Sequence, residues 1–244
     1  APILSHRRMW NGMWRKRIVD ACLFLILAGL LAYEIVIMRG NHFYAVSLII
    51  IVTGILRFLL SFEKSHPSVQ MMAVIAALCG LATASRIAFF FLPQVKPIAA
   101  VVIICGIVYG GEAGFVTGAV SAFVSNFYFG QGSWTPFQMF ALGLIGFFTG
   151  ILFRERQNRI AVSVYGFCSV VVLYGGIVDL NTVFMMSGGL DAGTAAGVYL
   201  SALPFNTAFG ISTAAFLFLL YRPVVRRLER ISRKYCLIDK DAEK

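Results

Sequence analysis

Residues 113–153 read AGFVTGAVSAFVSNFYFGQGSWTPFQMFALGLIGFFTGILF and contain no Asp, Glu, Lys or Arg. Two apolar runs flank the short polar segment 130–133. Each run approaches the roughly 20 residues that a helix needs to cross the hydrocarbon core of a bilayer. Lipid offers no hydrogen-bond partners, so the backbone of such a run must satisfy its own polar groups as a helix. The stretch therefore predicts a hairpin of two membrane-spanning helices.

The whole chain of 244 residues has the same character. It is 59% hydrophobic and 13% charged, with a mean hydropathy of +0.82. Soluble domains carry roughly 25% charged residues, and their surface-to-volume ratio could not hide this much apolar surface. We therefore predict an all-α polytopic helix bundle in a lipid bilayer. The predicted spans are 18–38, 43–62, 69–92, 97–109, 113–129, 136–153, 160–184 and 192–221.

The formal net charge of +10 reflects basic residues in short segments between the apolar runs. This distribution is typical of membrane topology, and we do not expect nucleic-acid binding. With the N-terminus inside, all but three of the 21 Lys and Arg lie on the inner side, and Arg39, Arg86 and Lys96 are the exceptions. The bias predicts that both termini are cytoplasmic.

Three regions follow from the composition. Residues 1–66 form a predicted cytoplasmic tail and two-helix hairpin. Residues 67–222 form a six-helix core rich in Gly, Ala, Ser and Thr, which allow close helix packing in lipid. Residues 223–244 form a predicted basic cytoplasmic tail.

Polar residues gather near the outer ends of the core helices. Such residues are costly in a membrane unless they face a cavity or a partner, so together they predict an outward-facing binding site. Arg86 could instead pair with Asp179 or reach the interface, Asn126 and Asn206 could link helices, and Lys96 could be a solvated loop charge. The candidates are Arg86, Gln94, Lys96, Asn126, Gln131, Trp134, Thr135, Gln138, Tyr174, Asp179 and Asn206.

The loop at 130–133 contains two glycines, which permit a tight turn. We expect Thr135 to cap the next helix and Pro136 to lie in its first turn. Trp134 could stack on a planar ligand or lie in the interfacial aromatic belt.

Small residues also recur on the predicted helix 69–92. Ala73, Ala76, Ala77 and Gly80 could admit a neighbouring helix or a partner subunit, and the pattern leaves both open. Glycines at 106, 110, 114, 118, 143, 146 and 150 are expected to serve internal packing.

No HExxH, GxSxG or Walker A motif is present, so the sequence predicts neither an enzyme nor a chain that hydrolyses ATP. The five cysteines show no zinc-site spacing, and no metal or cofactor is expected. A non-enzymatic solute-binding subunit is the leading hypothesis. A self-sufficient secondary transporter, a membrane enzyme and a structural or sensor protein are the alternatives.

The segments LPQVKP (92–97), GEAGFVTGA (111–119) and SNFYFGQGSWTPFQMFALGLIG (125–146) resemble the substrate-binding S components of energy-coupling factor (ECF) vitamin transporters. The resemblance covers residues 68–222. It implies a six-helix core in the bacterial cytoplasmic membrane, a vitamin substrate, a membrane scaffold subunit and two ATPase subunits as partners.

The resemblance also implies roles for individual residues. Ala73 and Ala77 match the alanine motif that docks on the scaffold, and the substrate site falls around Gln94, Asn126, Gln131, Trp134 and Gln138. The motifs most resemble S components assigned to cobalamin or its precursors. The N-terminal hairpin departs from the family pattern.

Overall fold

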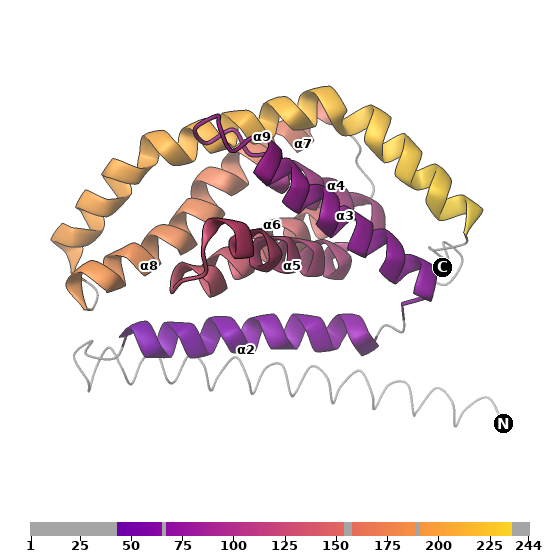
Figure 1. Cartoon of the computed structure of the whole chain (residues 1–244). Helices are drawn as coiled ribbons and strands as arrows, with labels where there is room; N and C mark the ends of the chain where they lie inside the picture. Colours follow the sequence, from indigo (N-terminus) through magenta and orange to yellow (C-terminus); the bar gives the residue numbers. More distant parts are fainter. Residues whose placement is uncertain (1–42, 65–66, 154–157, 189–190, 236–244) are drawn as a thin grey trace.

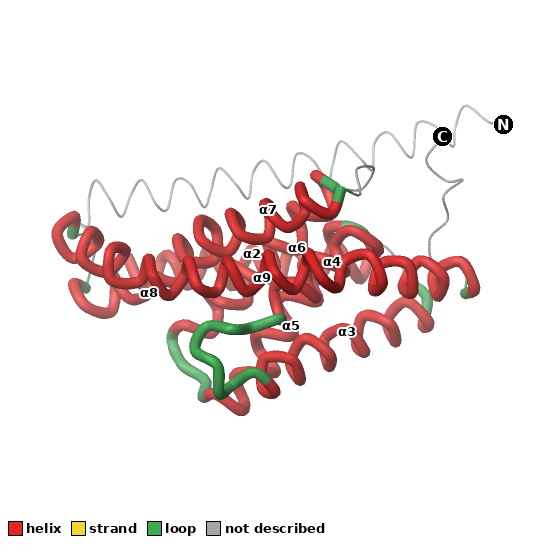
Figure 2. The backbone as a smooth tube through the Cα atoms, turned by 90° about the horizontal axis from the view of Figure 1, so that it is seen from above, coloured by secondary structure: helices red, strands yellow, loops and turns green. Residues whose placement is uncertain are grey.

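The computed structural model describes residues 43–64, 67–153, 158–188 and 191–235, and the regular secondary structure in these ranges is entirely helical. Figure 1 shows α9 and α2 on opposite sides of the molecule with α5 and α6 between them. Short loops join the helices, and the longest described one connects α3 to α4 (Figure 2). The elements are α2 (Phe43–Lys64), α3 (Val69–Ala88), α4 (Ile98–Tyr109), α5 (Gly111–Phe129), α6 (Trp134–Leu152), α7 (Arg159–Ser169), η1 (Val170–Tyr174), α8 (Gly175–Ser187) and α9 (Ala192–Lys234).

Five described segments are long and apolar enough to cross a membrane, which confirms the polytopic helix bundle. They correspond to α2, α3, α6, the unit from α7 to α8, and α9. The predicted span 18–38 lies outside the described residues.

The two remaining helices lie inside the bundle. Helix α4 has 12 residues, a length of about 18 Å, and most of its side chains are buried. Helix α5 has 19 residues but includes Gly, Ser, Thr and Asn. It contacts α2, α3, α4 and α6, so its polar content faces protein rather than lipid.

Glycines bring α4, α5 and α6 into backbone contact, as the sequence predicted. A Cβ on Gly114 would lie 2.6 Å from the carbonyl oxygen of Gly146 and 2.8 Å from the Cα of Gly106. Gly118 and Gly150 also lie against backbone atoms, whereas Gly143 lies against the Phe115 ring. Gly110 takes part through its backbone, because a Cβ on Gly150 would lie 2.7 Å from the Gly110 carbonyl carbon, although a Cβ on Gly110 itself would meet no atom within 4 Å. Its φ of 93° makes the turn from α4 into α5.

Helix α2 packs against α5, α6 and α8 through an aromatic and aliphatic cluster. The Phe58 ring stacks on the Phe115 ring at a centroid distance of 3.9 Å. Ile51 and Ile55 are buried in the same cluster with Phe137. The helix is therefore part of the bundle and not merely attached to it.

The helix from Arg159 to Ser187 is continuous but not uniform. Residues Val170–Tyr174 form a π-helical segment between α7 and α8. A π segment accommodates one extra residue in an α-helix, and such insertions are frequent at functional sites. Tyr174, the last residue of this segment, packs edge-on against Phe209 of α9.

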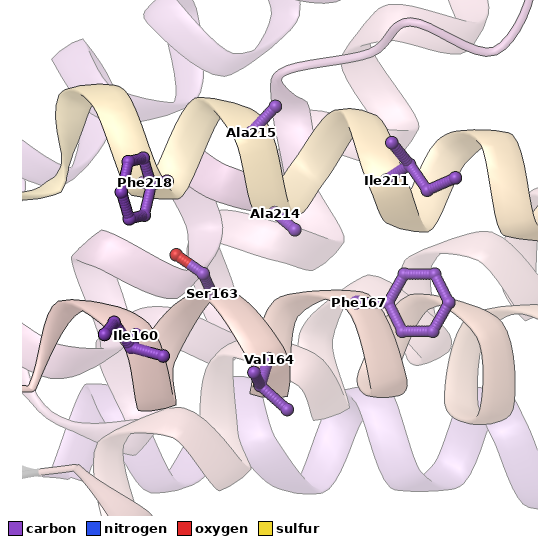
Figure 3. Close-up of a pocket in the computed structure, with 8 residues that line it drawn as sticks. All are labelled: Ile160, Ser163, Val164, Phe167, Ile211, Ala214, Ala215 and Phe218. Atoms are coloured by element: carbon purple, nitrogen blue, oxygen red, sulfur yellow. The ribbon is translucent and has the colours of Figure 1, made fainter.

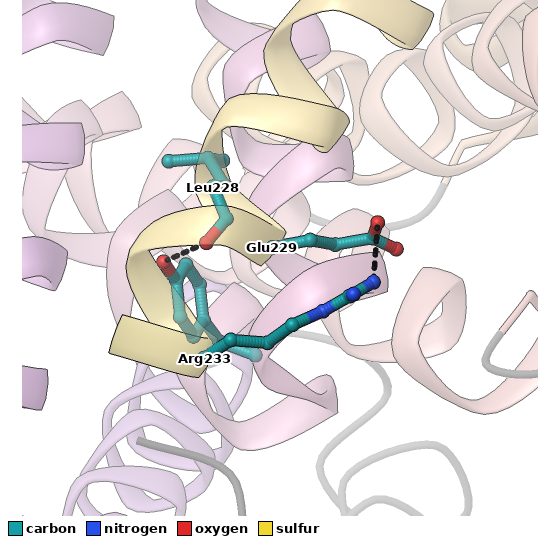
Figure 4. A network of polar contacts seen from close by, with 4 residues as sticks. Leu228, Glu229 and Arg233 are labelled. Atoms are coloured by element: carbon teal, nitrogen blue, oxygen red, sulfur yellow. Dashed lines mark hydrogen bonds and ion pairs between the residues drawn. The ribbon is translucent and has the colours of Figure 1, made fainter. Parts of the chain in front are cut away.

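Helix α9 has 43 residues and contains Pro204 and Pro223. Its arched course in Figure 1 agrees with the bending that internal prolines cause. The predicted boundary at 222 coincides with no break, because the helix continues to Lys234. Beyond Pro223 it still packs on the bundle: the Tyr109 hydroxyl donates to the Leu228 carbonyl at 3.5 Å (Figure 4).

Candidate functional site

Arg86 lies in the last turn of α3, with its guanidinium directed at α5. Its Nη1 donates hydrogen bonds to Ser125 Oγ at 2.5 Å and to Asn126 Oδ1 at 2.9 Å. The guanidinium carbon lies 4.6 Å from the centre of the Phe129 ring, within the range of a cation–π contact. These partners are neutral, and the ion pair with Asp179 that the sequence left open is not formed.

Asn126 is fully buried in α5 and links three helices. Its Oδ1 accepts from Arg86 of α3, and its Nδ2 donates to Thr135 Oγ1 at 3.2 Å and to Gln138 Oε1 at 2.9 Å, both on α6. A buried amide needs such partners to offset its desolvation. The interhelical role of Asn126 is confirmed, and its amide fixes the position of the Arg86 side chain.

Thr135 organises the loop between α5 and α6, but not as a helix cap. Helix α6 begins at Trp134, and Ser133, at the cap position, forms no side-chain cap bond. Thr135 lies inside the first turn, and its hydroxyl accepts from the Gly132 N–H and donates to Gln131 Oε1. The predicted cap is therefore wrong: the hydroxyl folds back on the loop instead of satisfying the helix N–H groups.

Lys96 is partly buried in the loop between α3 and α4 and is not a solvated charge. Its ammonium donates to Gln94 Oε1 at 3.0 Å and lies 5.8 Å from the centre of the Phe209 ring. The backbone of Gln94 has a φ of 59°, which is uncommon for a residue with a side chain. Burial, and next the charge of Arg86, lower the pKa of Lys96 from 10.5 to about 8.

A cavity of about 240 Å³ opens between the end of α3, the following loop and the end of α5. Its volume is below the roughly 300–1,000 Å³ that is usual for small-molecule sites. Three predicted site residues line it, together with five residues that the prediction missed. The lining residues are Arg86, Gln94, Lys96, Phe89, Phe90, Leu92, Pro93 and Phe129.

A second polar group lies on α8 and α9. The Asn206 amide donates to Asp179 Oδ2 at 2.7 Å, which confirms that Asn206 links helices. A Cβ on Gly175 would lie 2.6 Å from Asn206 Nδ2, so the glycine makes room for this pair. Tyr174 connects the two groups, because its hydroxyl lies against Gln138 and within electrostatic range of Arg86 and Asp179.

The predicted residues fall into two sets, those that line the cavity and those that hold Arg86 in position. Arg86, Gln94 and Lys96 line the cavity, and Asn126, Thr135, Gln138 and Gln131 form the hydrogen-bonded support behind Arg86. Trp134 does not line the cavity. Its ring lies against Gly132 and is 42% exposed. Phe89, Phe90 and Phe129 also line the cavity, but the sequence did not single them out because phenylalanine is common throughout this apolar chain.

The small residues of α3 lie on an open face. Ala73, Ala76, Ala77 and Gly80 are all exposed, and a Cβ on Gly80 would meet no atom within 4 Å. We call these four residues the alanine face. Of the two possibilities that the sequence left open, an internal neighbour is excluded for the described part of the chain.

A larger hollow of about 460 Å³ lies between α7 and α9 (Figure 3). Its lining is apolar apart from Ser163, and it includes Phe167, Ile211 and Phe218. At the end of this hollow, the Arg159 guanidinium stacks on Phe218 at 3.9 Å. The groove lacks the converging polar groups of a solute site.

The membrane-spanning helices define a polytopic membrane protein, and Arg86 and Lys96 line a cavity among aromatic and aliphatic side chains near the ends of α3 and α5. Among the described residues, no group of three His, Cys, Asp or Glu side chains could hold a metal ion. Comparison with known families narrows the class. The family model described as "ECF-type riboflavin transporter, S component" matches residues 64–226, about two thirds of the chain. The chain belongs to this family.

Membership confirms the assignment to the ECF S components, which are transporter subunits and not enzymes. No curated protein and no solved structure gave a significant match. The cobalamin assignment has no support from the family description and stays a prediction. The match begins at residue 64, so all of α2 except its last residue lies outside the matched region.

Proposed function

We propose that this chain captures a vitamin as the substrate-binding subunit of an ECF importer, at the cavity beside Arg86 and Lys96. The cavity carries the proposal: charged and amide donors meet aromatic rings in one recess, as in sites for small polar ligands. Arg86 is held in place by Ser125 and Asn126, so its remaining donors are preorganised for a ligand.

A planar heteroaromatic vitamin of the flavin type is the first candidate substrate. The family is named for riboflavin, and the rings of Phe89, Phe90 and Phe129 suit a flat ligand. The Gln94 amide offers hydrogen bonds to ring carbonyl and N–H groups. Cobalamin or a cobalamin precursor is the competing candidate. A corrinoid is much larger than a cavity of about 240 Å³ and would have to rest mostly outside it.

We propose that the cavity faces the exterior of a bacterial cytoplasmic membrane. The support for this orientation is the excess of Lys and Arg around residues 154–159 and after residue 222, which favours the inner side for these segments and hence the outer side for 89–97 and 130–133. Both termini are then cytoplasmic, and substrate enters the cavity before any partner acts.

The alanine face is the proposed docking surface for the ECF scaffold subunit, which in turn binds two ATPase subunits. Its four exposed small residues would let a partner helix approach the α3 backbone closely. ATP hydrolysis belongs to those partners in this scheme, and the chain itself supplies selectivity.

Thermal unfolding of the full chain in detergent tests the capture step. A ligand that binds only the folded state raises the unfolding temperature in a concentration-dependent way. The panel contains riboflavin, FMN, cobalamin, cobinamide and other B vitamins. We expect a saturable increase with a flavin and none with the corrinoids. A saturable increase only with a corrinoid would reverse the order of the candidates, and none with any vitamin would contradict vitamin capture.

A further inference from the structure

Two cations share the cavity, and no acidic side chain in the part of the chain that the structure describes pairs with either of them. Arg86 and Lys96 are close enough for the charge of Arg86 to act on the Lys96 ammonium. Among the described residues, neither cation forms an ion pair. Asp179, the carboxylate on α8, is instead hydrogen-bonded by Asn206. Within residues 43–64, 67–153, 158–188 and 191–235, the positive charge of the cavity is therefore not compensated by a carboxylate.

Most hydrogen-bond donors of these two side chains have no partner among the described residues. A guanidinium has five N–H donors, and an ammonium has three. Arg86 uses only Nη1, for its bonds to Ser125 and Asn126, and Lys96 donates only to Gln94 in the described part of the chain. Both side chains line the cavity, so the remaining donors are available there.

Removing charges from water is costly unless they are paired. Repulsion between the like charges of Arg86 and Lys96 in the same cavity adds to this free-energy cost. The neighbouring rings of Phe129 and Phe209 offer cation–π contacts, which offset this cost only in part. An anion in the cavity would supply the missing counter-charge and accept the unused hydrogen bonds.

We propose that the substrate binds through an oxyanion, a carboxylate or a phosphate, held between Arg86 and Lys96. The proposal rests on vitamin capture at this cavity and narrows the substrate class to acidic vitamins and phosphorylated forms. The acidic group lies at the two cations, and the planar or apolar part lies against Phe89, Phe90 and Phe129. Within the flavins, FMN is then the better ligand and riboflavin the weaker one.

Matched pairs of ligands that differ in the acidic group test the proposal. The pairs are FMN and riboflavin, nicotinate and nicotinamide, and pantothenate and pantothenol. Dissociation constants are measured by calorimetry on the full chain in detergent at pH 7. We expect the acid of at least one pair to bind about tenfold or more tightly than its neutral partner, as one charge-assisted hydrogen bond would give.

If, in every pair that binds, the neutral member binds as tightly as its acid or more tightly, the oxyanion site is overturned while vitamin capture stays intact. If no member of any pair binds, and no other vitamin does, capture itself fails and the oxyanion site fails with it. The two failures therefore give different results.

The variant Lys96→Met identifies the cation responsible. It removes the ammonium and retains an unbranched apolar stem, so we expect the affinity for the acid to fall about tenfold and the affinity for its neutral partner to change less than threefold. Lys234→Met is the matched control, because Lys234 is exposed at the end of α9. If Lys96→Met still binds the acid more tightly than its neutral partner by the same factor, Lys96 does not hold the acidic group, which contradicts the proposal.

Discussion

Lys96 should make the free energy of unfolding of the ligand-free protein depend on pH in the alkaline range. Its pKa is about 8 in the folded chain and 10.5 for an unperturbed lysine, because burial and then Arg86 disfavour the charge. Between these values the unfolded chain binds more protons, so the free energy of unfolding rises with pH. We expect the unfolding temperature of the ligand-free protein to rise from pH 8 to pH 10 relative to Lys96→Met.

The comparison with Lys96→Met is necessary because other groups in the same cluster also carry charge or titrate. These groups are Arg86, Tyr174 and Asp179. A bound oxyanion would give the opposite trend: its affinity should fall as the pH passes 8, since the ammonium that holds it loses its proton. Parallel pH profiles for wild type and Lys96→Met in the free protein would show that Lys96 keeps an ordinary pKa.

Trp134 and Asn126 should differ in their effect on substrate binding. The sequence places it beside Gln131 and Thr135, but its ring lies on Gly132 and outside the cavity. We expect Trp134→Ala to change the dissociation constant of the substrate less than twofold, measured by calorimetry. Asn126→Ala should weaken binding at least tenfold, because it releases the Arg86 guanidinium from one of its two acceptors. Equal effects of the two substitutions would contradict this arrangement.

At the scale of elements, the crowded glycines determine stability. Gly114→Ala would drive a methyl group into the Gly146 carbonyl, and we expect a loss of about 1–3 kcal/mol, seen as a lower unfolding temperature. Gly80→Ala is the matched control, because the added Cβ would meet no atom within 4 Å and alanine favours the helix more than glycine does. A Gly114→Ala protein as stable as the control would mean that α5 and α6 can separate at no cost.

Most of these elements were predictable, and the exceptions have physical causes. Apolar runs predicted α2 to α9 because lipid imposes both length and hydrophobicity on a helix. The course of α9 beyond residue 222 was missed, because past the hydrophobic run it is stabilised by amphipathic packing on residues such as Tyr109. The π segment at 170–174 has no known sequence signal. The polar residues that line the cavity, Arg86, Gln94 and Lys96, were selected by their cost in lipid, whereas the ring of Phe129 was not, and their role in binding stays a prediction.

At the scale of the whole molecule, binding and transport should be separable. Ala73→Trp and Ala77→Trp place bulk on the alanine face, well outside the cavity lining. We expect substrate affinity of the isolated chain to be unchanged and vitamin uptake by cells that express the complete transporter to be lost. Leu219→Trp, at an exposed position on α9, is the control and should keep uptake. Uptake retained in both alanine-face variants would exclude this face as the docking surface.

The π segment Val170–Tyr174 has an evolutionary consequence. The wider π turn absorbs one residue more than an α-helical turn holds, so losing one residue there would restore a regular α-helix and keep the faces of α7 and α8 as they are. The pair of Asp179 and Asn206 would then stay together. A single-codon deletion at 170–174 is therefore expected to be tolerated, and family members that differ in length by one residue here are expected to share the same packing of α8 on α9.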